Sequence, residues 1–324
     1  MEEKLYVKQA RKGMNTVALT VLAYYGFMNF FAILVMLVDL LCYVIGQMIQ
    51  SLPVDMDGMM QYMMDSVTKN GWGYILSILV GTVIVLAWKK KAFWRNEMFA
   101  KNGKMTAGAF FQLLAVFLSA QLFAQLFSIV LEWLLNLMGL SAVAALEAAA
   151  ITSTGFSMFL YVTILGPVSE ELLFRGLLLR LVKPWGKQTA ILVSALVFGL
   201  FHGNIIQIPF AFLVGLVLGY VTVEYSIIWA IVLHIFNNLV MSDLLGRLSS
   251  LMTETAGTVL LYGILIVAAA AAVVLLICNR QQVKAYFAEN RCDRKALRAL
   301  VTSPAMIIFA VVMLLMSLLS ITSI

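Results

Sequence analysis

Long apolar stretches recur along this chain of 324 residues, and they constrain its fold more than any other feature. A membrane-spanning helix needs about 20 consecutive apolar residues. About nine stretches come near that length, at roughly residues 17–45, 72–88, 109–138, 156–181, 186–202, 205–222, 226–245, 257–278 and 304–321. They lack the alternation of a barrel strand, so helices are the structure that can satisfy the backbone in lipid. The sequence therefore predicts an all-α, multi-pass integral membrane helical bundle of about eight to nine transmembrane helices.

The placement of charge agrees with this topology. Only 12% of the residues are charged, against roughly 25% in soluble domains. Basic residues gather in segments 4–12, 89–104, 180–187 and 279–303. These segments fall on one side of the membrane if the spans alternate, and the positive-inside rule makes that side cytoplasmic. The net charge of +6 is then a signal of topology and does not indicate a nucleic-acid partner.

We expect residues 1–324 to form one membrane domain, surrounded by the lipid bilayer of a bacterial cytoplasmic membrane, with a cytoplasmic N-terminus. No internal repeat divides the chain. The three cysteines, Cys42, Cys278 and Cys292, are scattered, so neither a disulfide framework nor a cysteine metal site is predicted.

Ionisable residues occur in three of the apolar stretches. Glu170, Glu171 and Arg175 lie in one, and the only two histidines, His202 and His234, lie in two others. A charge at the centre of a bilayer costs about 2.5–3.5 kcal/mol on insertion scales, so such residues mark functional sites. These ionisable residues lie on three separate predicted helices. Their occurrence together indicates that the three helices form a single site.

Spacing within the first stretch predicts a division of roles between the two carboxylates. Glu171 and Arg175 are four residues apart and share one helix face, which suits an ion pair. Glu170 points about 100° away and remains free for proton transfer. The alternative is that all three lie in water at a helix end, but apolar residues continue beyond them.

The other two stretches each contain a histidine with a partner four residues away. Phe198 lies one turn before His202 and predicts an apolar wall beside that imidazole. His234 and Asn238 face the same way, and together they could hold an oxyanion or a water molecule. An interfacial histidine and an interhelical hydrogen bond remain the simpler alternatives. Two further acids in apolar spans, Asp39 and Glu132, are interpreted as structural.

The ordered set EExxxR, FxxxH and HxxxN resembles the CPBP family of membrane proteins. That family includes the CAAX prenyl endopeptidases, the bacteriocin-processing enzymes and their bacterial Abi-type relatives. The three motifs are met by Glu170, Glu171 and Arg175, by Phe198 and His202, and by His234 and Asn238. They lie within about residues 155–245, which the resemblance marks as the catalytic core helices.

The resemblance implies an intramembrane endopeptidase of the glutamate type that needs no cofactor. Glu170 and His202 would activate a water molecule, and His234 and Asn238 would stabilise the tetrahedral oxyanion. Glu171, Arg175 and Phe198 would support them. The same residues leave a zinc-dependent version open, in which Glu170, His202 and His234 bind the metal.

The implied substrate is a membrane-associated or prenylated protein or peptide. Two other classes remain open from the residues alone. One is a non-catalytic membrane protein for bacteriocin self-immunity or scaffolding. The other is an ion-coupled transporter, since buried Glu and His also mark proton relays.

Overall fold

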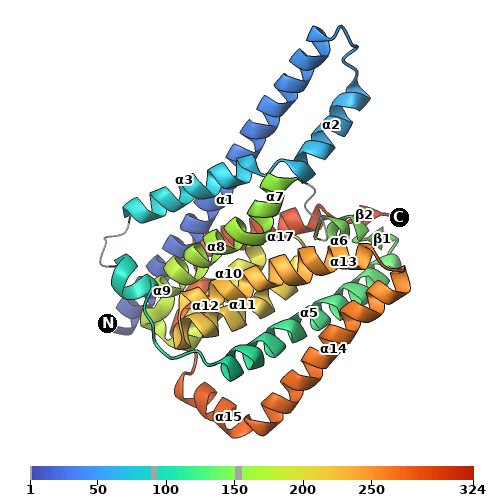
Figure 1. The fold of residues 1–324 in the computed structure, drawn as a ribbon. Coiled ribbons are helices and arrows are strands. Elements are labelled where there is room, and N and C mark those ends of the chain that lie inside the picture. Colours follow the sequence, from blue (N-terminus) through green and yellow to red (C-terminus); the bar gives the residue numbers. More distant parts are fainter. Residues whose placement is uncertain (1, 89–92, 150–154) are drawn as a thin grey trace.

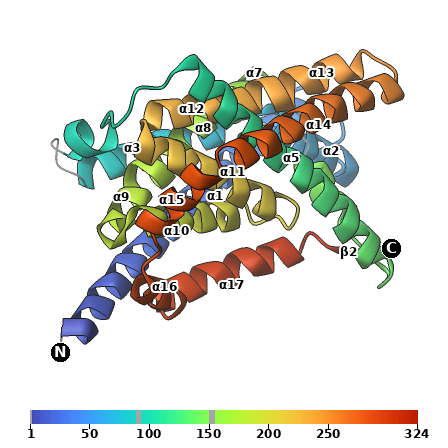
Figure 2. The same ribbon diagram turned by 90° about the horizontal axis from the view of Figure 1, so that it is seen from below.

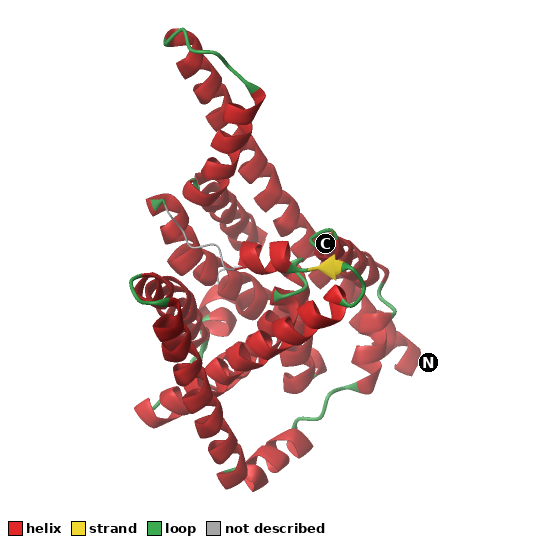
Figure 3. Cartoon of the chain, turned by 90° about the vertical axis from the view of Figure 1, so that its right-hand side faces the viewer, coloured by secondary structure: helices red, strands yellow, loops and turns green. Residues whose placement is uncertain are grey.

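The computed structural model describes residues 2–88, 93–149 and 155–324, and these residues are almost entirely helical (Figure 1). The described residues contain one short pair of strands, which lies near the C-terminus (Figure 3). The prediction of an all-α fold is confirmed. Residues 89–92 of the predicted basic connector lie outside the described ranges.

The first half of the chain contains six helical elements and one strand among the described residues: α1 (Glu2–Ile49), α2 (Met56–Lys69), α3 (Trp72–Trp88), the π-helix η1 (Trp94–Met98), α5 (Ala107–Asn136), β1 (Leu140–Ser141) and α6 (Val143–Ala149). An almost unbroken helical run then extends from residue 156 to residue 185, in which α- and π-helical segments alternate before a final 3-10 turn: α7 (Phe156–Leu160), η2 (Tyr161–Leu165), α8 (Gly166–Glu171), η3 (Leu172–Leu178), α9 (Leu179–Val182) and η4 (Lys183–Trp185).

The second half consists of helices and one strand: α10 (Lys187–Phe201), α11 (Gln207–Glu224), α12 (Ile227–Ile235), the π-helix η5 (Phe236–Leu244), α13 (Leu245–Ser250), α14 (Glu254–Cys278), α15 (Arg280–Glu289), α16 (Arg294–Val301), α17 (Pro304–Leu318) and β2 (Thr322–Ser323). Figure 2 shows α16 and α17 along one edge of the bundle, where α17 packs against α1 and α10.

Polar side chains begin several of the apolar helices. The Thr106 hydroxyl accepts a hydrogen bond from the backbone N–H of Ala109 at 3.1 Å and begins α5. Thr253 does the same for Ala256 at the start of α14. Such N-caps satisfy orphan backbone donors and contribute about 1 kcal/mol each. They fix where two long apolar helices leave their connecting segments.

Helix α1 is much longer than a membrane crossing. Its 48 residues extend about 72 Å at 1.5 Å per residue, whereas the hydrocarbon core is about 30 Å thick. The C-terminal part of α1 projects beyond the bundle together with α2 (Figure 1). Its buried residues all lie in the N-terminal half, at Ala10, Met14, Val17, Ala18, Val21 and Tyr24. That half of α1 therefore packs into the body of the protein.

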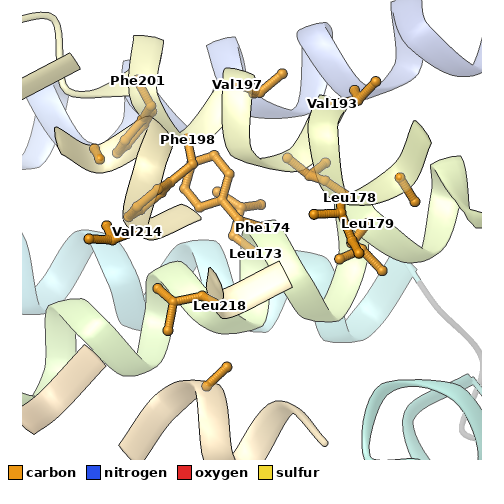
Figure 4. Packing of buried hydrophobic residues seen from close by; sticks show 14 of the residues in the cluster. Leu173, Phe174, Leu178, Leu179, Val193, Val197, Phe198, Phe201, Val214 and Leu218 are labelled. Atoms are coloured by element: carbon orange, nitrogen blue, oxygen red, sulfur yellow. The ribbon is translucent and has the colours of Figure 1, made fainter. Parts of the chain in front are cut away.

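The core joins the helical run 166–182 to α10 and α11. Figure 4 shows Phe174 and Leu178 from η3 packed with Phe198 from α10 and Leu218 from α11. A side chain at Gly215 on α11 would bring its Cβ within 3.1 Å of the Ala195 Cα on α10. The close approach of α10 and α11 thus depends on glycine.

Fewer helices than expected meet the length and composition of a membrane span. Within the described residues five do so, α1, α5, α11, α14 and the continuous run Ile227–Ser250, and the pair α16–α17, bent by 62°, would make six. The prediction of eight or nine counted residues 72–88 and 186–202, which form apolar helices shorter than 18 residues. It also counted residues 156–181, whose π segments and charged residues interrupt a uniform apolar helix.

The two isolated acids of the apolar spans hold backbone and connecting segments in place. Glu132 accepts hydrogen bonds from the Ser141 hydroxyl at 2.8 Å and from the Ala142 N–H at 2.7 Å. Asp39 accepts from the Ser66 hydroxyl and the Asn70 amide. Both sets of contacts agree with the structural roles expected for these acids.

Candidate active site

A fully buried ion pair lies at the centre of the site. Arg175 Nη1 donates to Glu171 Oε1 at 2.8 Å, and neither side chain is exposed to solvent. Arg175 Nη2 donates to the Gly215 carbonyl at 3.3 Å, and the guanidinium lies 4.2 Å from the ring centroid of Phe198. The predicted ion pair is present, and it ties α8 and η3 to α10 and α11.

The two adjacent glutamates point in different directions because they follow each other on a helix. Glu171 ends α8 and points into the core, whereas the side chain of Glu170 is 19% exposed. The π-helix η3 begins directly after them and contains Arg175. Short π-helical segments inside α-helices are frequent at functional sites. Glu170 is therefore the carboxylate that a ligand can reach.

His234 connects the two carboxylates. Its Nδ1 lies 2.9 Å from Glu171 Oε1, and its Nε2 lies 3.7 Å from Glu170 Oε2. Since Glu171 also accepts from Arg175, it acts as a carboxylate, and His234 Nδ1 is the donor. This bond orients the imidazole so that Nε2 faces Glu170.

His202 lies at the C-terminal end of α10, where Gly203 ends the helix with a φ of +57°. His202 Nδ1 donates to the Phe198 carbonyl at 2.9 Å, since a carbonyl can only accept. Nε2 of the neutral ring is then an acceptor, and no hydrogen bond to it is seen among the described residues. The Phe198 ring meets both imidazoles edge-on, at 4.9 Å from His202 and 5.8 Å from His234. The apolar wall predicted beside His202 is present.

Asn238 is oriented by a chain of amides. Its Nδ2 donates to the Val162 carbonyl at 2.9 Å, and its Oδ1 accepts from Asn237 Nδ2 at 3.0 Å. Asn237 Oδ1 in turn accepts from Gln121 Nε2 of α5 at 2.6 Å. One N–H of the Asn238 amide has no recorded acceptor within the described residues.

Six of the seven predicted site residues form one continuous cluster: Glu170, Glu171, Arg175, Phe198, His202 and His234. Asn238 lies on the segment after His234, but no hydrogen bond joins the two in the described structure. The helix changes from α to π at Phe236, between these two residues.

Sequence reasoning missed the residues that support this cluster from other helices. Gln121 was detectable as a polar residue inside an apolar span, and Asn237 as the neighbour of Asn238. Tyr24 and Ser169, which hydrogen-bond each other beside Glu170, gave no sequence signal that distinguished them. Val162 and Gly215 contribute through their backbone carbonyls. Every residue has such a carbonyl, so the residue type in the sequence does not reveal this role.

The imidazole nitrogens and carboxylate oxygens of the site are of the kind that bind metal ions. Among the described residues, however, they are not arranged around a common point as metal ligands are. Zinc in a catalytic site takes three protein ligands. Within the described ranges no group of three or more His, Cys, Asp or Glu side chains is placed to hold a metal ion. The zinc-dependent version therefore has no geometric support from these residues and stays a prediction that a chemical test must decide.

The fold and the site define an integral membrane protein of the helical class with a buried carboxylate–imidazole centre. Residues 152–240 match the family model described as type II CAAX prenyl endopeptidase Rce1-like. This match covers 89 of the 324 residues and supports a CPBP/CAAX protease assignment for that part of the chain. The matched range covers the three motifs. Searches of curated proteins and of solved structures gave no match.

Proposed function

We propose that this protein is an intramembrane endopeptidase in which Glu170 and His202 activate the attacking water molecule. The observation that carries the proposal is the pairing of a reachable carboxylate with two oriented imidazoles, beside an ion pair that is wholly buried. The family match over the same residues favours peptide hydrolysis over the other reactions that such a centre could perform.

The first step uses Glu170 as general base. A water molecule near Glu170 gives a proton to that carboxylate, and its oxygen attacks the scissile carbonyl carbon. His202 Nε2 is an acceptor in the neutral ring and helps to hold the water. A positioned general base contributes about 10²–10⁴-fold to the rate. No covalent bond between enzyme and substrate is needed.

The second requirement is stabilisation of the oxyanion that forms on the carbonyl oxygen. His234 Nε2 donates when the ring carries both protons, and the Glu171 carboxylate then balances that charge. The free N–H of Asn238 supplies a second donor, and its amide is held in place by Asn237 and Val162. One such donor contributes about 10²–10³-fold to the rate.

In the last step the carbon–nitrogen bond breaks. The proton taken up by Glu170 passes to the leaving amine, so the products are a new carboxyl terminus and a new amino terminus.

With His234 protonated, the charges of Glu170, Glu171, Arg175 and His234 sum to zero. A neutral group of four lowers the cost of holding these charges away from water.

We further propose that the substrate is a membrane-associated or prenylated peptide and that the N-terminus is cytoplasmic. The family implies a membrane-associated substrate. The basic segments 4–12, 180–187 and 279–303 are joined by contacts: Lys295 pairs with Glu3 at 3.3 Å, and Glu224 pairs with Lys187 at 3.1 Å and accepts from Tyr286 at 3.0 Å. Basic segments that gather on one side favour the cytoplasmic side for it.

The test is product analysis by mass spectrometry after incubation of purified protein with a library of prenylated and leader-type peptides. Glu170→Gln removes the base, and Glu132→Gln is the matched control, because Glu132 only holds the β1 segment. We expect products from the wild type and Glu132→Gln but not from Glu170→Gln. Products from all three proteins would refute the assignment of Glu170, and no products from any would refute the peptidase.

A further inference from the structure

Tyr24 belongs to the N-terminal helix α1, outside the matched residues 152–240, yet it reaches the candidate active site. Its buried hydroxyl donates to Ser169 Oγ at 3.2 Å. Ser169 in turn donates to the Gly166 carbonyl at 2.8 Å. Ser169 immediately precedes Glu170. These two bonds anchor α8 to α1 at the residue before the proposed general base.

The ring of Tyr24 is enclosed by two further helices. A Cβ at Gly81 on α3 would lie only 2.9 Å from Tyr24 Cε2, so glycine leaves the room for the ring. On α10 the ring lies 6.0 Å from that of Phe201, the residue before His202. Tyr24 is thus held between the segment that carries Glu170 and the helix that carries His202.

The phenol of Tyr24 is also an electrostatic neighbour of Glu170. Tyr161 of η2 is a second such neighbour, and its ring stacks on Tyr74 of α3 at 4.9 Å. Both hydroxyls thus lie within electrostatic range of Glu170, on segments that the three sequence motifs do not include.

We propose that Tyr24 is a positioning residue for Glu170. Its hydrogen bond to Ser169 fixes α8 so that the Glu170 carboxylate stays directed at the water and the scissile carbonyl. Helix α1 then completes a site that the motif-bearing segment does not complete alone. The inference rests on the proposed endopeptidase function, and its test separates the two.

Tyr24→Phe removes the hydroxyl and keeps the ring. Tyr25→Phe is the matched control, since Tyr25 is adjacent and its ring also packs against Phe201, at 5.8 Å. In the described structure no hydrogen bond is recorded for the Tyr25 hydroxyl. For a peptide that the wild type cleaves, we expect Tyr24→Phe to lower kcat about tenfold, the equivalent of one hydrogen bond, with KM within about twofold. Tyr25→Phe should change neither by more than about twofold.

A double-mutant cycle distinguishes positioning through Ser169 from a general structural effect. Ser169→Ala should lower kcat by a similar factor, and Tyr24→Phe/Ser169→Ala should be no slower than the worse single variant, because both break one connection. Thermal unfolding of each variant should stay close to that of the wild type. A double variant slowed by the product of the two single effects would contradict the mechanism.

The same assay separates this inference from the proposed function. Wild-type cleavage with an unchanged kcat in Tyr24→Phe would refute the positioning role and leave the endopeptidase standing. Absence of cleavage by folded wild-type protein would overturn both. A loss of activity in Tyr24→Phe that is matched by Tyr25→Phe would also refute the inference, since packing alone would then explain it.

Discussion

Breaking the buried ion pair from the arginine side should destabilise the protein strongly. Arg175→Met removes the 2.8 Å contact with Glu171, the bond to the Gly215 carbonyl and the stacking on Phe198. It leaves the Glu171 carboxylate fully buried. Removal of one partner from a buried pair costs about 3–5 kcal/mol. His234 still donates to Glu171, so we expect a loss near the lower end, about 3 kcal/mol.

The assay is equilibrium unfolding of purified protein in detergent, with Arg180→Met as the matched control. Arg180 follows Arg175 in the same helical run and is only 6% exposed. Its Nε and Nη2 have no hydrogen-bond partner among the described residues. Among the described residues Arg180 has no ion pair within 4 Å and only a longer-range attraction to Glu97. Arg180→Met should therefore change the free energy of unfolding by less than about 1 kcal/mol.

A second variant tests whether the loss comes from uncompensated charge. Glu171→Gln added to Arg175→Met removes that charge, and the Gln side-chain oxygen can still accept from His234. We expect the double variant to recover about 2 kcal/mol relative to Arg175→Met alone. Equal losses in Arg175→Met and Arg180→Met, or strictly additive losses in the double variant, would refute the reasoning.

Three further predictions concern the oxyanion site, metal dependence and acid stability. Asn238→Ala should lower kcat about 10²-fold. Gln121→Leu removes the hydrogen-bond donor to Asn237 and should lower kcat about fivefold. Steady-state kinetics on the cleaved peptide would measure both effects, and kcat values equal to that of the wild type would contradict them. A zinc chelator should leave the cleavage rate within about twofold, whereas loss of activity restored by Zn²⁺ would favour the zinc-dependent version. Partial burial opposes ionisation of Asp293, but hydrogen bonds from Tyr6 and from the N–H groups of Ala296 and Lys295 hold its pKa below the usual value. The stability from Asp293 is therefore present above the pKa of the unfolded carboxyl and lost as pH falls through the folded value. Asp293→Asn should make the thermal unfolding temperature less sensitive to acid; an unchanged slope would contradict this.

Local spacing predicted the contacts that lie within one helix. The ion pair between Glu171 and Arg175 and the contact between Phe198 and His202 both follow from residues four apart on an α-helix. The helical nature of the fold followed equally directly from the length of the apolar stretches. These features depend only on helix geometry, which the sequence pattern reveals.

Contacts between helices could not be predicted in the same way. His234 meets Glu171 across 63 residues of sequence, and Tyr24 meets Ser169 across 145. Such pairings depend on how helices pack, and no local period encodes them. The α-to-π transition at Phe236 likewise arises within a continuous helix, and no local period encodes it.

The number of spans depends on how the shorter apolar helices are counted. Residues 72–88 and 186–202 form apolar helices shorter than 18 residues, and composition alone does not distinguish such a helix from a full crossing. Apolar runs shorter than about 18 residues fit a buried core helix as well as a membrane span.

The central claim, that Glu170 is the base for peptide hydrolysis, is tested most directly by single-turnover cleavage in liposomes. Wild-type protein and Glu170→Gln, each shown to be folded, would be mixed in excess with one peptide identified as a substrate. The account predicts cleavage by the wild type and a rate at least about 10³-fold lower for Glu170→Gln. Cleavage by Glu170→Gln at close to the wild-type rate would contradict it.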